Sequence, residues 1–107
     1  MKSVFTIKLQ GDLDAITIEP YNTAIYKLIA TITNPSIAVL DFSQVRYLNS
    51  TAIGNIAHWL SLFQEKSSEM HLVELSESVY DTLDLVGLLH AIPHHESIAA
   101  FKKTISS

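Results

Sequence analysis

The chain has 107 residues, which suits one domain and is too short for a two-domain catalytic cleft. Seven Lys and Arg against eleven Asp and Glu give a formal net charge of −4, so the chain lacks the positive charge that drives nonspecific binding to nucleic acid or anionic lipid. It has no cysteine, which excludes disulfides, thiolate nucleophiles and cysteine zinc sites. We expect one domain over residues 1–107 and no nucleic-acid partner.

The distribution of apolar residues indicates a soluble protein. No apolar run approaches the roughly 18 to 20 residues that span a bilayer, and the first residues lack a signal-peptide pattern. We therefore expect a cytoplasmic protein without membrane insertion. Hydrophobic residues make up 48% of the chain and charged residues only 17%, below the usual quarter. Such a surface is poor in charge, which favours partial cover by a partner protein.

The first third of the chain has a strand pattern followed by a helix pattern. Residues 5–10 alternate between apolar and polar, as in a half-buried strand, and Gly11-Asp12 is expected to end it. Apolar residues then recur at helical spacing over residues 18–32, with Thr17 as a candidate N-cap. Asn34-Pro35 predicts the end of this helix, because the residue before a proline avoids the α region.

The middle of the chain repeats that order. Residues 37–42 form a nearly unbroken apolar run, which predicts a strand buried on both faces, and residues 43–48 are expected to form a loop. A second helical stripe follows and extends to about Lys66. Residues 71–75 then predict a short strand.

The last third is predicted to be mainly helical. Ser76 or Ser78 is expected to cap a third helix whose apolar stripe includes Val86, and Gly87 is expected to close it. An irregular stretch around Pro93 follows, with room for one short strand. The spacing of apolar residues then predicts a helix over residues 98–105. This alternation is typical of a mainly parallel or mixed sheet covered by helices.

Two separated motifs resemble those of the STAS domains, the sulfate-transporter and anti-sigma-factor-antagonist family. Residues 39–54, Val-Leu-Asp-Phe-Ser-Gln-Val-Arg-Tyr-Leu-Asn-Ser-Thr-Ala-Ile-Gly, are similar to the family's strand, loop and helix-start signature. Residues 11–14, Gly-Asp-Leu-Asp, look like the family's Gly-Glu-Leu-Asp. The resemblance implies one α/β STAS domain with a mixed sheet of about four or five strands and about four helices packed chiefly on one side.

The resemblance also assigns roles at the second motif. Thr51 falls on the serine that is phosphorylated in the antagonist branch, and Ser50 is its neighbour. Asn49 stands where the family has an acidic residue, Ala52 replaces a glycine, and Gly54 is retained. Some members use threonine as the phosphoacceptor, so Thr51 and, failing that, Ser50 are the expected phosphorylation sites.

Local physical chemistry gives these polar residues two interpretations. Asn49, Ser50 and Thr51 are good N-cap residues directly before an apolar helical stripe, so they could serve only to cap the helix. A hydroxyl there could also accept a phosphate, because a helix N-terminus stabilises its charge of about −1.5 to −2.

The implied function is that of an anti-sigma-factor-antagonist-like module in bacterial partner switching, without catalytic activity. We expect it to bind an anti-sigma factor or switch serine kinase, to be released by phosphorylation, and to be restored by a serine phosphatase. The expected contact residues are Asp12, Asp14, Asn49, Ser50, Thr51, Ala52 and Gly54. The alternative is a constitutive STAS subunit, such as the partner of a lipid-transport ATPase or a stressosome-like scaffold. The neutral Asn49 favours that alternative.

Other candidate chemistry has weaker support. His90, His94 and His95 with Glu96 form a cluster that could bind metal, but Pro93 opposes the helix that would align them, so a solvated loop is the better interpretation.

The remaining polar residues do not form a recognisable catalytic motif. Ser50, His58 and Asp41 could be assembled into a hydrolase triad, although no nucleophile-elbow motif is present. Trp59 could contact a partner or pack half-buried. The sequence has neither a P-loop nor a dinucleotide fingerprint. We expect no catalytic residue, metal site or cofactor.

Overall fold

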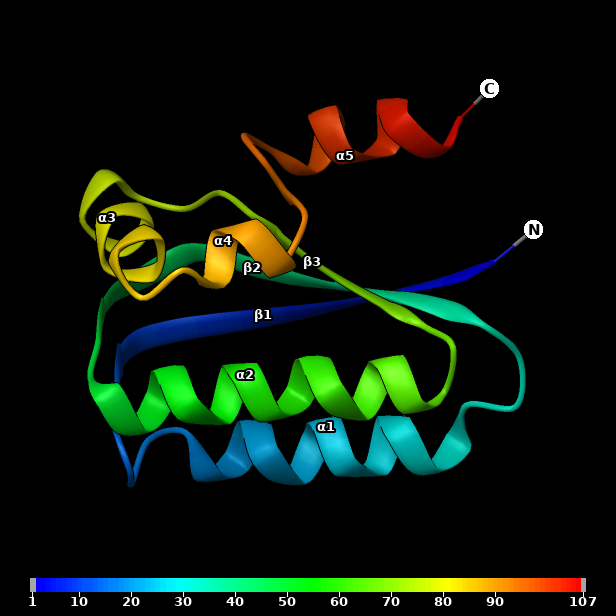
Figure 1. Ribbon diagram of the computed structural model, residues 1–107, viewed down its shortest axis with the longest axis horizontal. Helices are drawn as coiled ribbons and strands as arrows, with labels where there is room; N and C mark the ends of the chain where they lie inside the picture. The colour runs from blue at the N-terminus through cyan, green and yellow to red at the C-terminus, as the bar shows by residue number, and fades with distance from the viewer. Residues whose placement is uncertain (1, 107) are drawn as a thin grey trace.

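The computed structural model describes residues 2–106, which form one layered α/β unit (Figure 1). Its elements follow in the order β1 (Ser3–Leu13), α1 (Glu19–Thr31), β2 (Ser36–Leu48), α2 (Ser50–Glu65), β3 (Glu69–Val73), α3 (Glu77–Leu85), α4 (Leu88–Ala91), β4 (His94–His95) and α5 (Ile98–Ile105). The predicted fold class is therefore confirmed, with four strands and five helices in this range.

The strands form one sheet in the order β1-β2-β3-β4. Within residues 2–106 each neighbouring pair is parallel, so the expected mixture of strand directions is wrong. The physical reason is that helical crossovers connect successive strands, and such connections return the chain in the same direction.

The two faces of the sheet carry cores of different size. Side chains from α1 to α4 share one large apolar cluster with alternate strand residues such as Leu40 and Leu72. The intervening residues Val39 and Val73 face the other side, where Phe101 of α5 packs on them. Figure 1 shows α5 across the sheet from α1 and α2. The prediction that helices lie chiefly on one side is confirmed.

Strand β2 is longer than predicted, because residues 43–48 continue it instead of forming a loop. Val45 and Leu48 are buried, and β2 stays paired with β1 as far as Leu13 and Leu48. Two register shifts in this pairing, one of them after Gly11 with its φ of 83°, let the ladder continue past the polar residues. The same pairing carries β1 beyond its expected end at Gly11-Asp12.

The stretch around Pro93 contains the expected short strand β4, but the residues before it form the short helix α4, which the sequence did not predict. Gly87, with a φ of 81°, lies after the end of α3 as expected and separates α3 from α4. The prediction for Trp59 differs from the structure. Trp59 is fully buried between α1 and α2 and is neither half-buried nor at a partner rim. Its Nε1–H donates to Asn22 Oδ1 at 2.7 Å, which satisfies its polar atom in the core.

Candidate functional site

Helix α2 begins immediately after β2 ends, and Asn49 is its N-cap. The backbone of Asn49 is extended, and its Oδ1 accepts a hydrogen bond from the Ala52 N–H at 3.0 Å. Its carbonyl oxygen accepts from the Ile53 N–H at 3.0 Å. Asn49 therefore supplies the cap, so neither the Ser50 nor the Thr51 hydroxyl is needed for it.

The residues after the cap divide between surface and core. Ser50, Thr51 and Gly54 are exposed, so the two hydroxyls and the glycine lie on the accessible side of the first helical turns. Ala52 is fully buried in the large cluster, and its side chain cannot contact a partner. A Cβ added at Gly54 would meet no atom within 4 Å, so this glycine leaves open surface instead of relieving a close contact.

The first motif forms a tight turn between β1 and α1. Asp14 Oδ1 accepts hydrogen bonds from the Ile16 and Thr17 N–H groups, both at 2.9 Å. The Thr17 hydroxyl donates to the Asp12 carbonyl oxygen at 2.8 Å. These bonds, first the Thr17 N–H and then the Ile16 N–H, lower the pKa of Asp14 below its ordinary value. Thr17 belongs to this turn and is not the N-cap, a position held by Ile18.

The two motifs meet at the same end of the sheet. The Asn49 N–H donates to the Leu13 carbonyl oxygen at 3.1 Å, which joins the start of α2 to the end of β1. Asp12 pairs in register with Tyr47, and its carboxylate lies 3.6 Å from Arg46 Nε in an exposed ion pair. One continuous region at this end of the sheet therefore carries five of the expected contact residues: Asp12, Asp14, Asn49, Ser50 and Thr51.

Large apolar side chains are exposed beside these polar residues in sequence and also at the end of α3. Ile16 in the β1–α1 turn is 81% exposed, and Tyr47 at the end of β2 is 58% exposed. At the end of α3, Leu85 and Val86 are 88% and 53% exposed. Figure 1 shows α3 at the end of the molecule where α2 begins. Helical spacing placed Val86 in a buried stripe, but α3 ends at Leu85 and Val86 therefore leaves the helical phase.

The hydrolase triad considered from the sequence does not assemble. His58 lies eight residues after Ser50 on α2, a rise of about 12 Å along the helix. Asp41 lies within β2, and its Oδ1 accepts from the Ser43 N–H at 2.8 Å. The structure therefore gives Asp41 a local role, as the acceptor for a backbone N–H two residues along β2.

The histidine cluster also has a different arrangement from the one considered. His95 Nε2 lies 2.9 Å from Nδ1 of His71, a residue that the sequence pattern did not connect with it. Among residues 2–106 no three His, Cys, Asp or Glu side chains are grouped closely enough to hold a metal ion. The sequence could not predict this contact, because it depends on the pairing of β3 with β4. Strand β4 is only two residues long and therefore has no recognisable strand pattern.

Comparison with known proteins decides the family. A family model described as the STAS domain matches residues 2–101. The chain belongs to the STAS family. Over the residues described, no helix combines the length and apolar character needed to cross a membrane.

Several solved STAS structures are similar in fold. A putative anti-sigma factor antagonist from Thermotoga maritima has a TM-score of 0.81 at 17% identity, covering 94% of this chain and 86% of that one. The anti-sigma factor antagonist SpoIIAA in its unphosphorylated form has a TM-score of 0.77 at 17% identity, covering 98% and 90%.

A sulfate transporter family protein from Wolinella succinogenes has a TM-score of 0.77 at 14% identity, covering 95% of this chain and 85% of that one. At these identities the similarities show the fold alone. Proteins described in these different ways share the fold, so a proposal about function has to rest on this chain's own residues.

Proposed function

We propose that this STAS domain is a protein-binding module, without catalytic activity of its own, that acts as an anti-sigma factor antagonist. Its partner is an anti-sigma factor or a related switch serine kinase, which docks on the start of α2 and the adjoining β1–α1 turn. Phosphorylation of Thr51, or failing that Ser50, releases the partner, and a serine phosphatase restores binding. The proposed setting is the bacterial cytoplasm.

The observation that carries this proposal is the division of roles at the start of α2. Asn49 caps the helix through its side chain, while the Ser50 and Thr51 hydroxyls are exposed and adjacent to the first-turn amides. A phosphate on either hydroxyl would lie at the positive end of the helix dipole. The first turn contains no acidic side chain that would repel it. The fold can therefore tolerate the modification.

The same position makes a phosphate harmful to a complex. One phosphate changes the formal net charge from −4 to about −6, and it places that charge on the docking surface. Ile16 and Leu85 give this end of the molecule exposed apolar side chains that a partner would bury. A dianion among them would have to be desolvated in the complex, which opposes binding.

The neutral cap favours one alternative. The neutral Asn49 stands where the family has an acidic residue before the phosphoacceptor, which favours a partner other than a kinase. In the second candidate role, this STAS domain is a constitutive subunit of a larger assembly, such as a lipid-transport ATPase or a stressosome-like scaffold. In that case the α2 start contacts its partner permanently and no hydroxyl is modified.

Mass spectrometry distinguishes the two roles. The purified protein is incubated with the anti-sigma factor kinase of its own organism and Mg-ATP, and the phosphate is located by peptide sequencing. We expect modification at Thr51 or Ser50, which Thr51→Ala and Ser50→Ala together abolish. Ser61→Ala is the matched control, because Ser61 is an exposed serine farther along α2. Absence of phosphate from both hydroxyls would favour the constitutive role.

A further inference from the structure

Two histidines on neighbouring strands share a hydrogen bond on the face of the sheet that α5 covers. His71 Nδ1 of β3 and His95 Nε2 of β4 lie 2.9 Å apart. The rings are nearly parallel, with an interplanar angle of 7° and centroids 5.1 Å apart. These values fit two rings joined edge to edge by the hydrogen bond. The bond therefore ties the two strands together beneath α5.

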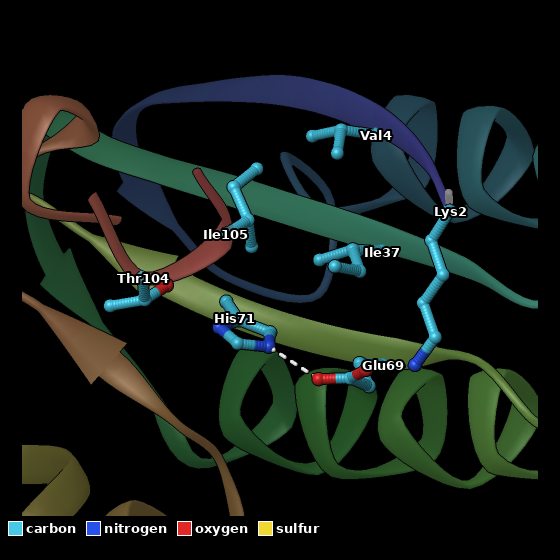
Figure 2. Close-up of a pocket in the computed structure, with 7 residues that line it drawn as sticks. All are labelled: Lys2, Val4, Ile37, Glu69, His71, Thr104 and Ile105. Atoms are coloured by element: carbon cyan, nitrogen blue, oxygen red, sulfur yellow. Dashed lines mark hydrogen bonds and ion pairs between the residues drawn. The ribbon is translucent and has the colours of Figure 1, made fainter. Parts of the chain in front are cut away.

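A carboxylate fixes the direction of this bond. His71 Nε2 lies 2.9 Å from Glu69 Oε1, a contact drawn as a dashed line in Figure 2, and Glu69 also accepts from the Lys2 ammonium. Because a carboxylate only accepts, His71 Nε2 carries the proton. In the neutral ring His71 Nδ1 is then an acceptor, and His95 Nε2 donates to it. One proton lies between the two facing nitrogens.

The pair can take up one further proton but not two. When His71 is protonated, its Nδ1–H donates instead, and His95 accepts by changing tautomer. When both rings are protonated, the two facing nitrogens each carry a hydrogen, so the bond is lost and two positive charges oppose each other. His71 is buried, which makes this repulsion more costly than at an exposed site.

The packing of α5 depends on these rings. Phe101 is buried, and its ring centroid lies 5.2 Å from that of His71 and 5.4 Å from that of His95. Within residues 2–106, Phe101 shares beyond the histidines only a small apolar cluster, with Ile98 and the three buried residues Ile37, Val39 and Val73. Helix α5 has eight residues, too few to be stable without tertiary contacts.

We propose that the His71–His95 pair is a pH-sensitive latch, which holds α5 on the sheet at neutral pH and releases it when both rings are protonated. Release opens the groove of about 470 Å³ that Thr104 and Ile105 of α5 wall on one side (Figure 2). The groove floor includes Ile37 and Val4, so apolar sheet surface becomes accessible. This device lies across the sheet from α2 and is independent of the proposed partner surface.

The sign of the pH dependence follows from the surroundings of the pair. Burial, then His71, then His94 lower the pKa of His95. The contribution of neutral His95 to the docking of α5 is therefore fully present above the ordinary histidine pKa of about 6.5 and is lost as the pH falls below it toward the lowered value. Other titratable side chains beside the pair in sequence, or on the elements around it, include Asp41, Tyr80, His94, Glu96, Lys102 and Lys103.

Hydrogen exchange of the full chain between pH 7.5 and pH 5 tests the latch. The Phe101 N–H bonds the Ser97 carbonyl oxygen at 3.0 Å inside α5, and it reports docking. After correction for intrinsic exchange, we expect its protection to fall about tenfold or more, because release of α5 exposes this amide to solvent. Amides of α2 and the fluorescence of buried Trp59 should not change. Equal loss in α2, or no loss in α5, would overturn the proposal.

The matched variants are His95→Gln and His94→Gln. A glutamine at 95 can donate to His71 Nδ1 at neutral pH, can accept from it in acid, and does not titrate. We expect His95→Gln to keep α5 protected throughout, while His94→Gln retains the pH response. If His95→Gln fails to dock α5 at pH 7.5, ring ¹⁵N NMR of the unmodified protein decides. The pH midpoint for the loss of α5 protection must coincide with the pH midpoint for the protonation of His95. Different values for the two midpoints would refute the latch.

Discussion

The indole Nε1–H of Trp59 donates to Asn22 Oδ1 at 2.7 Å, and both side chains are buried where α1 packs against α2. The bond joins the helix that follows the Asp14 turn to the helix that carries Ser50 and Thr51. Two parts of the proposed partner surface are therefore held in a fixed relation by a polar contact inside the core.

Replacing Trp59 with Phe tests the energetic weight of that contact. The variant leaves the Asn22 oxygen buried without its donor, which costs about 1–3 kcal/mol in addition to the lost packing. Urea unfolding followed by circular dichroism measures the change. Asn22→Leu removes the other partner, and we expect the double variant to lose less than the sum of the single losses. Strict additivity would mean that the bond contributes nothing.

Removing the N-cap of α2 should destabilise the domain modestly. Asn49→Ala deletes the acceptor for the Ala52 N–H, a change that costs about 1 kcal/mol at a typical N-cap. Asn49→Ser should retain most of the stability, because a hydroxyl can also cap. Gln64→Ala, an exposed change near the other end of the helix, is the control. Equal unfolding midpoints for Asn49→Ala and the unmodified protein would contradict the assignment of the cap.

Charge at Thr51 should decide partner binding. Thr51→Glu imitates part of the phosphate charge, and we expect it to weaken binding at least tenfold, a loss of about 1.4 kcal/mol. Thr51→Ala should bind as the unmodified protein does, since the hydroxyl has no capping role. Isothermal titration calorimetry with the purified partner measures both. Equal affinities for the two variants would refute the switch and leave the constitutive role.

The exposed apolar end of α3 should belong to the docking surface. Leu85→Lys should leave stability within about 0.5 kcal/mol, because the side chain makes little buried contact. The same change should weaken partner binding severalfold. Ala99→Lys is the matched control, because it adds the same charge at an exposed position on α5, across the sheet. If both variants weaken binding equally, the effect is one of net charge alone.

Acid should disrupt the Asp14 turn at a pH below the usual carboxyl range. The folded pKa is lowered from 3.8, so the contribution of this group to stability is present above that value and is lost as the pH falls through the lowered one. Carbon NMR of the Asp14 carboxyl gives the midpoint. The Thr17 hydroxyl also lies 3.1 Å from Asp14 Oδ1 as a donor, so Thr17→Val removes that bond and should raise the midpoint toward 3.8. An unchanged midpoint would exclude a contribution from the hydroxyl.

Local sequence patterns predicted the elements that carry a clear period or cap. Helix α5 has the bounds expected from the spacing of Ile98, Phe101 and Ile105, and Ser76 caps α3 as one of two predicted candidates. The second half of β2 was missed because its apolar residues Val45 and Leu48 are separated by polar ones. Its pairing with β1, a long-range contact, decides its conformation.

The candidate site was predicted only in part for a related reason. Within each motif the residues are adjacent in sequence, so each motif could be found from its own segment of the chain. Which polar side chain caps α2 could not be chosen from three suitable residues, and the exposure of Ile16 and Leu85 depends on how the turns are packed. The His71–His95 contact was missed because two strands must be aligned before the rings meet.

The hydrogen bond from Asn49 to Leu13 makes the proposed docking surface a discontinuous epitope. A linear peptide that copies residues 46–58 carries both hydroxyls but lacks the Asp14 turn and the exposed end of α3. The partner would then recognise the folded domain and ignore its unfolded or fragmented forms. Binding would thereby report the integrity of the fold as well as the state of Thr51.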